Sequence, residues 1–205
     1  MSRAVILCGG TISNYNYIKS QIKPDDTIIC ADSGYNHTVK MQIGVDLLVG
    51  DLDSVGIIPD GVEIIKFPAK KDLTDSEIAL SCARERGFNE FLLIGATGAR
   101  LDHTLTNLFL LKTCLLNNEN AQIIDDYNRM FLIDRECDLN EPKGTLVSLV
   151  PLADCTGVTA TGLEYPLAAE DLPFGSGRGI SNVMLGHTAR VSIETGVLAV
   201  ILARD

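Results

Sequence analysis

The chain has 205 residues, of which 46% are hydrophobic and 21% are charged, and its formal net charge is −10. These values are ordinary for a soluble globular protein. No apolar run reaches the roughly 18 residues that a membrane-spanning helix needs, so we expect no membrane contact. The acidic balance argues against a nucleic-acid partner, because binding a phosphate backbone requires clustered Lys and Arg.

The six cysteines lie far apart and include no C-x-x-C pair. This spacing argues against a zinc site or a disulfide framework, and several of the cysteines fall in apolar segments as small hydrophobic residues. The N-terminal segment lacks a cleavage-site pattern and is better explained as a buried first strand than as a signal peptide. We therefore expect a cytoplasmic protein.

Short apolar segments rich in Val, Ile and Leu recur through the first part of the chain, as buried parallel strands do. They are residues 4–8, 27–31, 47–50, 62–67, 91–95 and 121–124. Helical patterns lie between them at residues 74–86, with Thr74 or Asp75 as the cap, and at residues 102–116. The alternation predicts an α/β domain with a mainly parallel sheet over residues 1–126.

After residue 126 the pattern changes to short strand candidates separated by Gly, Pro, Asp and Asn. They are residues 130–133, 145–150, 157–161, 188–193 and 197–202. No convincing helical pattern interrupts them. Residues 127–205 are therefore predicted to form a small all-β domain, a sandwich or barrel.

Four loops that follow predicted strands concentrate the polar residues of the first domain. Because the carboxyl ends of parallel strands meet at one edge of a sheet, we expect these loops to form a ligand site there. The loops contain Asp32, Ser33 and Gly34, then Asp51 and Asp53, then Lys70, Lys71, Asp72 and Asp75, and finally residues 95–103.

Converging carboxylates repel one another, by about 4 kcal/mol for two unit charges 4 Å apart at an effective dielectric constant near 20. A divalent cation removes this repulsion, and Mg²⁺ takes carboxylate, water and phosphate oxygens as ligands. Gly95 and Gly98 would let a phosphate approach the backbone, and Arg100 would clamp it with two hydrogen bonds. The loops thus predict metal-assisted phosphate chemistry.

Each loop also has an ordinary structural interpretation. Asp75 can cap a helix, and Asp32 can belong to a turn. Asp51 and Asp53 can form a solvated acidic turn, although alternate residues of an extended segment point to one face. His103 is either a general base or a structural residue of the first helical turn.

In this order, the motifs resemble the thiamine pyrophosphokinase (thiamine diphosphokinase) family. The similar segments are residues 31–36, 50–54, 72–75 and 98–103 with Asn107 downstream, and residues 161–167 and 179–182 in the β domain. The resemblance covers nearly the whole chain. Each motif is weak alone, but their order and the α/β-then-β layout make the combination specific.

The resemblance implies that a pyrophosphoryl group passes from ATP to the hydroxyethyl arm of thiamine, giving thiamine diphosphate and AMP. It also implies a homodimer with thiamine near the subunit interface. The implied catalytic residues are Asp51, Asp53 and Asp75, which would hold Mg²⁺, together with Arg100 and Asp102. The implied nucleotide-binding residues are Asp32, Gly34, Asn36, Lys71, Asp72, Thr97, Gly98 and Arg100. The implied thiamine-binding residues are Asp102, Tyr165, Ser181 and Asn182, of which Tyr165 would stack on a ring.

Two positions depart from the family pattern, Ala99 in place of a usual Gly and Ser33 in place of a frequent Gly or Lys. Neither changes a charged group, so we expect activity to be retained. The proton acceptor stays open between Asp102 and Asp51, as do the number of metal ions and the nucleotide preference. Without the resemblance, Ser181 and Asn182 are simply a turn.

Two other classes of function remain for this sequence. A metal-dependent hydrolase of nucleotides or phosphate esters would use the same carboxylates and would release phosphate without an acceptor. A non-catalytic nucleotide or thiamine sensor would bind its ligand without turnover.

Overall fold

The computed structural model describes residues 3–52, 61–67 and 72–204. The chain divides into two compact units, Met1–Asp126 and Tyr127–Asp205. Among the described residues, no helix is both long and apolar enough to cross a bilayer.

In the N-terminal unit the described residues form six strands whose pairings are all parallel. Their spatial order is β6-β5-β1-β2-β3-β4. The strands are β1 (Ala4–Leu7), β2 (Thr27–Ala31), β3 (Leu47–Gly50), β4 (Glu63–Lys66), β5 (Glu90–Ile94) and β6 (Asn120–Ile124). β1 and β3 are buried along their whole length, which explains their uninterrupted apolar sequences.

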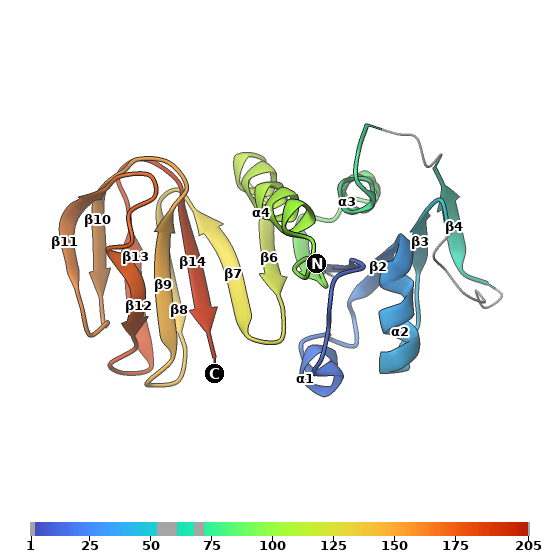
Figure 1. Cartoon of the computed structure of the whole chain (residues 1–205), viewed down its shortest axis with the longest axis horizontal. Helices are drawn as coiled ribbons and strands as arrows, with labels where there is room; N and C mark the ends of the chain where they lie inside the picture. Colours follow the sequence, from blue (N-terminus) through green and yellow to red (C-terminus); the bar gives the residue numbers. More distant parts are fainter. Residues whose placement is uncertain (1–2, 53–60, 68–71, 205) are drawn as a thin grey trace. The chain divides into compact units, whose positions relative to one another are not determined.

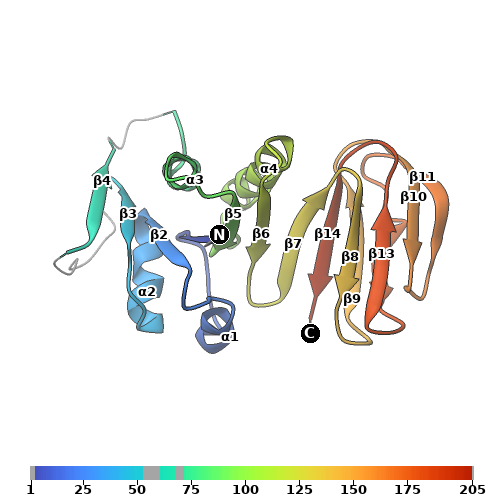
Figure 2. The same cartoon turned by 180° about the vertical axis from the view of Figure 1, so that it is seen from behind.

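Helices cover both faces of this sheet, with α3 (Asp75–Glu85) and α4 (Leu101–Leu116) on one side and α1 (Tyr15–Ser20) and α2 (Tyr35–Met41) on the other (Figures 1 and 2). The two long helices agree with the predicted ones. α1 and α2 were not predicted, because six and seven residues are too few to show a clear helical period.

Helix α3 begins with a capping box. The Thr74 hydroxyl accepts a hydrogen bond from the Glu77 backbone N–H, and the Glu77 carboxylate accepts one from the Thr74 N–H at 2.7 Å. Thr74 is therefore the cap, and Asp75 is the first helical residue. The N-cap alternative for Asp75 is therefore wrong.

The prediction of a buried strand at residues 62–67 is wrong in one respect. β4 is the last strand in the order, and three of its four residues are exposed. An edge strand has only one strand neighbour, so its apolar residues are not evidence of burial.

The strand order changes direction between β1 and β5. The chain passes from β1 to its neighbour β2 on one side, and from β5 to its neighbour β6 on the other. The segments that leave these two adjacent strands therefore diverge. In open α/β sheets the crevice that this creates at the carboxyl ends of the strands is where ligands bind.

The C-terminal unit contains two groups of antiparallel strands, in the orders β12-β9-β14-β7 and β11-β10-β13-β8. The strands are β7 (Asn128–Ile133), β8 (Glu136–Asn140), β9 (Leu146–Pro151), β10 (Cys155–Thr161), β11 (Leu167–Leu172), β12 (Gly179–Val183), β13 (Thr188–Ser192) and β14 (Leu198–Ala203). One buried core takes residues from both groups, including Val147, Val158 and Val191. The predicted combination of a helix-covered sheet and an all-β unit is confirmed.

Three of these strands, β8, β11 and β12, were not predicted from the sequence. The exposed faces of β8 and β11 carry acidic residues such as Glu136, Asp138 and Asp171, and neither strand contains a β-branched residue. β12 is only five residues long and begins with Gly179. Pairing with neighbouring strands, not local propensity, makes these segments extended.

Candidate functional site

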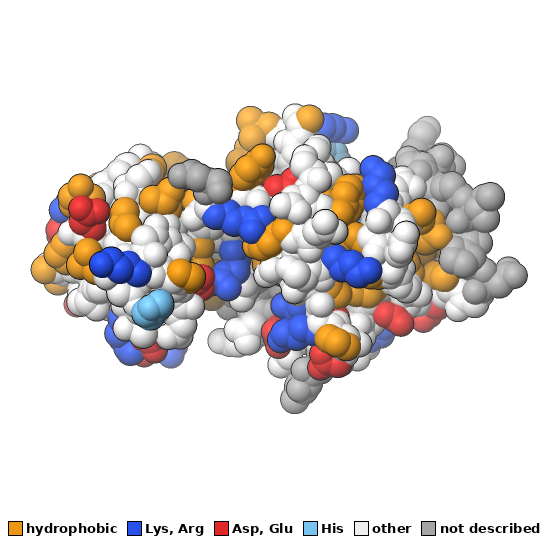
Figure 3. All heavy atoms as spheres, turned by 90° about the horizontal axis from the view of Figure 1, so that it is seen from below, with side chains coloured by type: hydrophobic (Ala, Val, Ile, Leu, Met, Phe, Trp, Pro, Cys, Tyr) orange, Lys and Arg blue, Asp and Glu red, His pale blue; other side chains and the backbone are white. Residues whose placement is uncertain are grey.

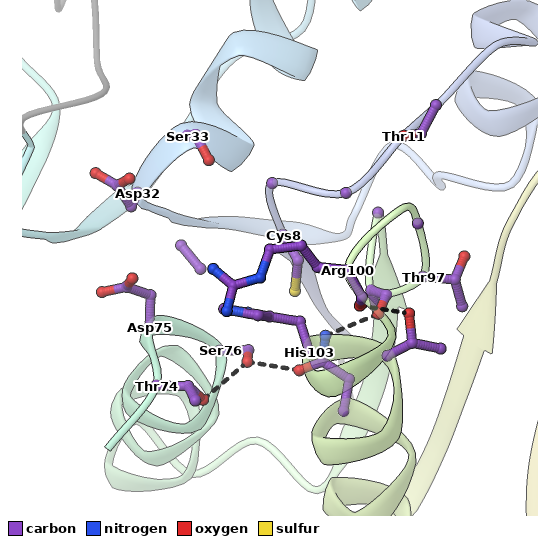
Figure 4. A pocket seen from close by; sticks show the side chains of 18 of the residues that line it. Cys8, Thr11, Asp32, Ser33, Thr74, Asp75, Ser76, Thr97, Arg100 and His103 are labelled. Carbon is purple, nitrogen blue, oxygen red and sulfur yellow. Dashed lines mark hydrogen bonds between the residues drawn. The ribbon is translucent and has the colours of Figure 1, made fainter. Parts of the chain in front are cut away.

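A cavity of about 280 Å³ lies at the carboxyl ends of β1, β2 and β5 (Figure 4). Its walls are the segments that follow these strands, residues 8–11, 31–33 and 95–100, and the first turns of α3 and α4. The cavity thus occupies the position where the strand order changes direction. The predicted edge of the sheet is the edge that carries the cavity.

Glycines allow two walls of the cavity to approach each other closely. A Cβ atom on Gly10 would lie 2.1 Å from the Thr97 carbonyl oxygen, and one on Gly95 would lie 2.4 Å from the Cys8 carbonyl oxygen. The Gly10 N–H donates to the Gly95 carbonyl at 2.8 Å. The Gly9-Gly10 loop was overlooked in the sequence, although a Gly-Gly pair directly after an apolar strand was the signal for it.

Asp32 is held in an unusual conformation at the rim of β2. Its φ of 45° is left-handed, and its Oδ1 atom is buried without a hydrogen-bond partner among the described residues. Gly50 makes room for it, because a Cβ there would lie 3.0 Å from the Asp32 Cβ. Left-handed non-glycine residues cost of order 1–3 kcal/mol and cluster at functional sites. Asp32 therefore combines backbone strain with an unsatisfied acceptor.

Asp75 contributes a second carboxylate to the same side of the cavity as Asp32 (Figure 4). It also lies close enough to the Cys8 thiol to act on it. Burial first, and the Asp75 charge second, raise the pKa of Cys8 to about 12. Two acidic groups thus face the space that Arg100 enters from the other side.

Arg100 lines the cavity and is paired with Asp102. The Arg100 Nε–Asp102 Oδ1 distance is 3.1 Å and the Nη2–Oδ2 distance is 2.5 Å. Hydrogen bonding to Arg100 lowers the pKa of Asp102 to about 2. Both side chains are exposed, so the pair orients the guanidinium more than it stabilises the fold. Asp102 itself does not line the cavity.

A buried polar network supports the cavity from behind. The Ser76 hydroxyl donates to Asn107 Oδ1 at 2.6 Å, and Asn107 Nδ2 donates to the Ala96 carbonyl at 2.8 Å (Figure 4). Ser76 and Asn107 are both buried. The network fixes α3, α4 and the loop after β5 to one another. The sequence pointed to Asn107 only through the family resemblance. It gave no sign of Ser76, because the partner of Ser76 lies 31 residues away.

The structure brings together some of the predicted site residues and not others. The cavity is lined by Asp32, Asp75, Thr97, Gly98 and Arg100, and also by His103. Asp53 and Lys71 lie outside the described residues. The described residues that were predicted for this site but do not line the cavity are Gly34, Asn36, Asp51, Asp72 and Asp102.

Gly34 has a clear packing role instead of a position at the cavity. A Cβ atom there would lie 1.9 Å from the Leu7 carbonyl oxygen, so only glycine lets the 3-10 turn Asp32–Gly34 lie against β1. Within the part of the chain that is described, no three His, Cys, Asp or Glu side chains gather as a metal-binding group.

The predicted thiamine residues of the C-terminal unit lie around β12. Asn182 is buried, its Oδ1 accepts from the Tyr165 N–H at 2.9 Å, and its Nδ2 donates to the Tyr165 carbonyl at 2.6 Å. Ser181 has a left-handed φ of 58° at a register shift between β12 and β9. Ser181 and Asn182 are thus part of a bulged strand, not a turn. Asn182 positions Tyr165, whose side chain is 57% exposed.

We expect the thiols to be unreactive in the folded protein. Burial raises the pKa of Cys8 and of Cys114 to about 12, which leaves roughly one thiolate in ten thousand at pH 8. Iodoacetamide at pH 8 should therefore leave activity unchanged, and all six thiols should react after unfolding in guanidinium chloride. Rapid inactivation that tracks labelling of Cys8, measured by mass spectrometry, would contradict this.

On the face shown in Figure 3, Lys and Arg side chains do not gather into one basic region. Lys and Arg side chains lie there at separate places among hydrophobic and uncharged polar atoms. Arg190, a basic residue of the second unit, is paired with Glu136 at 2.6 Å and Asp138 at 3.0 Å.

Comparisons with known proteins match both units. The family described as "Thiamin pyrophosphokinase, catalytic domain" matches residues 18–124, and "Thiamin pyrophosphokinase, vitamin B1 binding domain" matches residues 132–198. A thiamine pyrophosphokinase of Bacillus subtilis is 29% identical over 196 residues, covering 84% of this chain and 92% of the relative.

Solved structures agree with these matches. The crystal structure of thiamine pyrophosphokinase from Bacillus subtilis has a TM-score of 0.90 at 25% identity and covers all of both chains. That of thiamin pyrophosphokinase from Geobacillus thermodenitrificans has a TM-score of 0.86 at 26% identity and covers 100% of this chain and 98% of the other.

Proposed function

The chain belongs to the thiamin pyrophosphokinase family, and from this premise we propose that the cavity between β1 and β5 holds the phosphates of ATP during catalysis. The chain is an ATP-dependent thiamine diphosphokinase, which transfers the pyrophosphoryl group of ATP to thiamine and releases AMP. The observation that carries the location is Asp32, which lines a cavity with glycine walls and an arginine and whose Oδ1 is buried without a hydrogen-bond partner among the described residues.

The walls suit a phosphate chain. Gly10, Gly95 and Gly98 let the loops after β1 and β5 pack closely at the wall of the cavity, and Arg100 supplies a fixed positive charge with several donors. Thr97 is held by its hydroxyl, which donates to Asp125 Oδ2 at 3.0 Å. We propose that Gly98, Thr97 and Arg100 contact the phosphates, and that Asn36, Asp72 and Lys71 lie further along the nucleotide.

The donor set also fits Mg²⁺, which prefers carboxylate oxygens. Asp32 Oδ1 is a buried acceptor without a hydrogen-bond partner among the described residues, and Asp75 lies on the same side of the cavity. We propose that Asp75 holds the ion with Asp51 and Asp53. At the same place, Asp32 would accept a hydrogen bond from water or coordinate the ion. When bound, Mg²⁺ neutralises the charge of the phosphate oxygens during transfer.

In the proposed reaction the thiamine hydroxyl oxygen attacks the β-phosphorus of ATP. A bond forms between that oxygen and the β-phosphorus, the bond to the α,β-bridging oxygen breaks, and AMP leaves with the bridging oxygen. The hydroxyl proton passes to an aspartate. Because pairing with Arg100 lowers the pKa of Asp102 to about 2, Asp102 is a poor base while the pair persists. We propose that Asp102 holds Arg100 in place.

We further propose that the C-terminal unit is a β-sandwich that binds thiamine. Tyr165 would stack on a thiamine ring, Ser181 would lie beside it, and Asn182 would fix the Tyr165 backbone. A homodimer would bring this unit and the cavity of a second chain to one substrate. Six free thiols suit the cytoplasm, where disulfides are rare.

Product analysis tests the transfer directly. Incubation with ATP, Mg²⁺ and thiamine should give AMP and thiamine diphosphate in equal amounts, measured by anion-exchange chromatography. ADP with thiamine monophosphate would contradict pyrophosphoryl transfer. Phosphate release without thiamine would indicate a hydrolase, and tight binding of both ligands without products would indicate a sensor.

A further inference from the structure

His37 is a buried residue of α2 that the proposed reaction does not use. Its Nε2 lies 2.8 Å from the Gly10 carbonyl oxygen, and its Nδ1 lies 2.9 Å from the Tyr15 hydroxyl. Tyr15 belongs to α1, and the Lys40 ammonium lies 5.4 Å from the centre of its ring. His37 thus joins two helices to the loop that follows β1.

The partners of His37 determine where its proton lies. A carbonyl oxygen only accepts, so Nε2 carries the hydrogen and donates to Gly10. Nδ1 of the neutral ring is then an acceptor, and the Tyr15 hydroxyl donates to it. Burial lowers the pKa of His37, which keeps the ring neutral at physiological pH. The Tyr15 hydroxyl therefore donates to His37, and His37 in turn donates to the Gly10 carbonyl.

The hydrogen bond from His37 to the Gly10 carbonyl also orients the peptide group between Gly10 and Thr11. The structure has no cis peptide bond in its described part, and in a trans peptide the carbonyl and the following N–H point in opposite directions. With the Gly10 carbonyl directed to His37, the Thr11 N–H points away from His37. A Cβ atom on Gly98 would lie 3.0 Å from the Thr11 nitrogen.

Thr11 lines the cavity together with Gly10 and Gly98. Its N–H has no acceptor in the described part of the chain, whereas the neighbouring Gly10 N–H donates to Gly95. A backbone donor without a protein acceptor at the wall of a cavity is suited to an anionic oxygen. His37 itself is outside the cavity lining and acts only through the loop.

We propose that His37 is a positioning residue for ATP, which holds the Gly10 carbonyl so that the Thr11 N–H donates to a phosphoryl oxygen. The inference rests on the proposed function, because it requires the triphosphate to lie in this cavity. His37 thus contributes to the affinity for ATP and takes no part in the chemical step.

Calorimetry with the α,β-methylene analogue of ATP tests the proposal. In this analogue a carbon replaces the α,β-bridging oxygen, and its bond to the β-phosphorus is not cleaved in the reaction. His37→Leu removes both hydrogen bonds and should raise the Kd about tenfold, with the KM for thiamine changed by less than about twofold. His37→Gln, whose amide nitrogen can reach Gly10, should restore the Kd to within about threefold.

Thr38→Val is the matched control, because Thr38 is the next buried residue of α2 and its hydroxyl donates to Tyr35 at 2.7 Å, away from Gly10. It should lower the melting temperature without changing the Kd. An unchanged Kd in His37→Leu, or an equal rise in Thr38→Val, would overturn the proposal. If the Leu variant does not fold, Tyr15→Phe decides, since it should raise the Kd about threefold and an unchanged value would overturn the proposal.

The outcomes also separate this inference from the proposed function. If the wild-type chain makes thiamine diphosphate and His37→Leu keeps its affinity, only the role of His37 is lost. If the wild-type chain makes no thiamine diphosphate, the proposed function fails first.

Discussion

Asp32→Asn is expected to lower turnover at least about 100-fold while making the unliganded protein more stable. The substitution removes the charge of a carboxylate whose Oδ1 is buried and has no hydrogen-bond partner in the described part of the chain, a state that costs roughly 1–3 kcal/mol. Asn also tolerates the left-handed φ of 45° better than most residues. Opposite effects on activity and stability are the signature of a residue retained for its ligand.

Thermal unfolding without ATP and Mg²⁺ measures the stability effect. A gain of about 1 kcal/mol should raise the melting temperature by roughly 2–4 °C in a chain of this size. Asp25→Asn is the matched control, since Asp25 is exposed and precedes β2 at the amino edge of the sheet. It should change neither property. Loss of stability in Asp32→Asn would mean that Asp32 supports the fold instead of binding a ligand.

Asp75→Asn is expected to cut turnover by about 10²- to 10³-fold and to shift the Mg²⁺ requirement at least about tenfold upward. The Asp75 carboxylate faces the cavity, and Thr74 is the cap of α3. Loss of the Asp75 charge from the first turn costs the helix about 0.3–1 kcal/mol through the helix dipole. The loss of activity should therefore greatly exceed the loss of stability.

Titration of activity with Mg²⁺ distinguishes metal binding from a general loss of structure. In Asp75→Asn, higher Mg²⁺ should recover part of the activity, and EDTA should abolish activity in wild type and variant alike. Glu85→Gln removes a charge from the far end of α3 and should behave as wild type. Equal Mg²⁺ dependence in wild type and Asp75→Asn would remove Asp75 from the metal site.

The sequence predicts the fold best where burial is complete. The strands β1 and β3 are buried along their whole length, and β2 and β5 are buried after their first residue, because helices cover both faces of the sheet. Residue type alone therefore identifies these strands. α1 and α2 are too short for periodicity, and β8, β11 and β12 depend on pairing with distant strands. Such non-local pairing leaves no local pattern to read.

For the site, the sequence indicates the edge of the sheet but not every wall. Asp32, Asp75 and Arg100 are found because charged residues after apolar strands stand out. The Ser76–Asn107 network and the His37–Gly10 contact join residues 31 and 27 positions apart, so only the fold brings them together. Asp51 lies on the predicted loop yet does not line the cavity, since β2 and not β3 is the neighbour of β1.

We propose above that the triphosphate of ATP occupies the cavity at the ends of β1, β2 and β5. A crystal structure of the wild-type protein with the α,β-methylene analogue of ATP, Mg²⁺ and thiamine tests it most directly. We predict phosphates between the Gly9-Gly10 loop and Arg100, with the ion against Asp75 and thiamine within reach of the β-phosphorus. Phosphates bound elsewhere, with this cavity empty, would contradict the account.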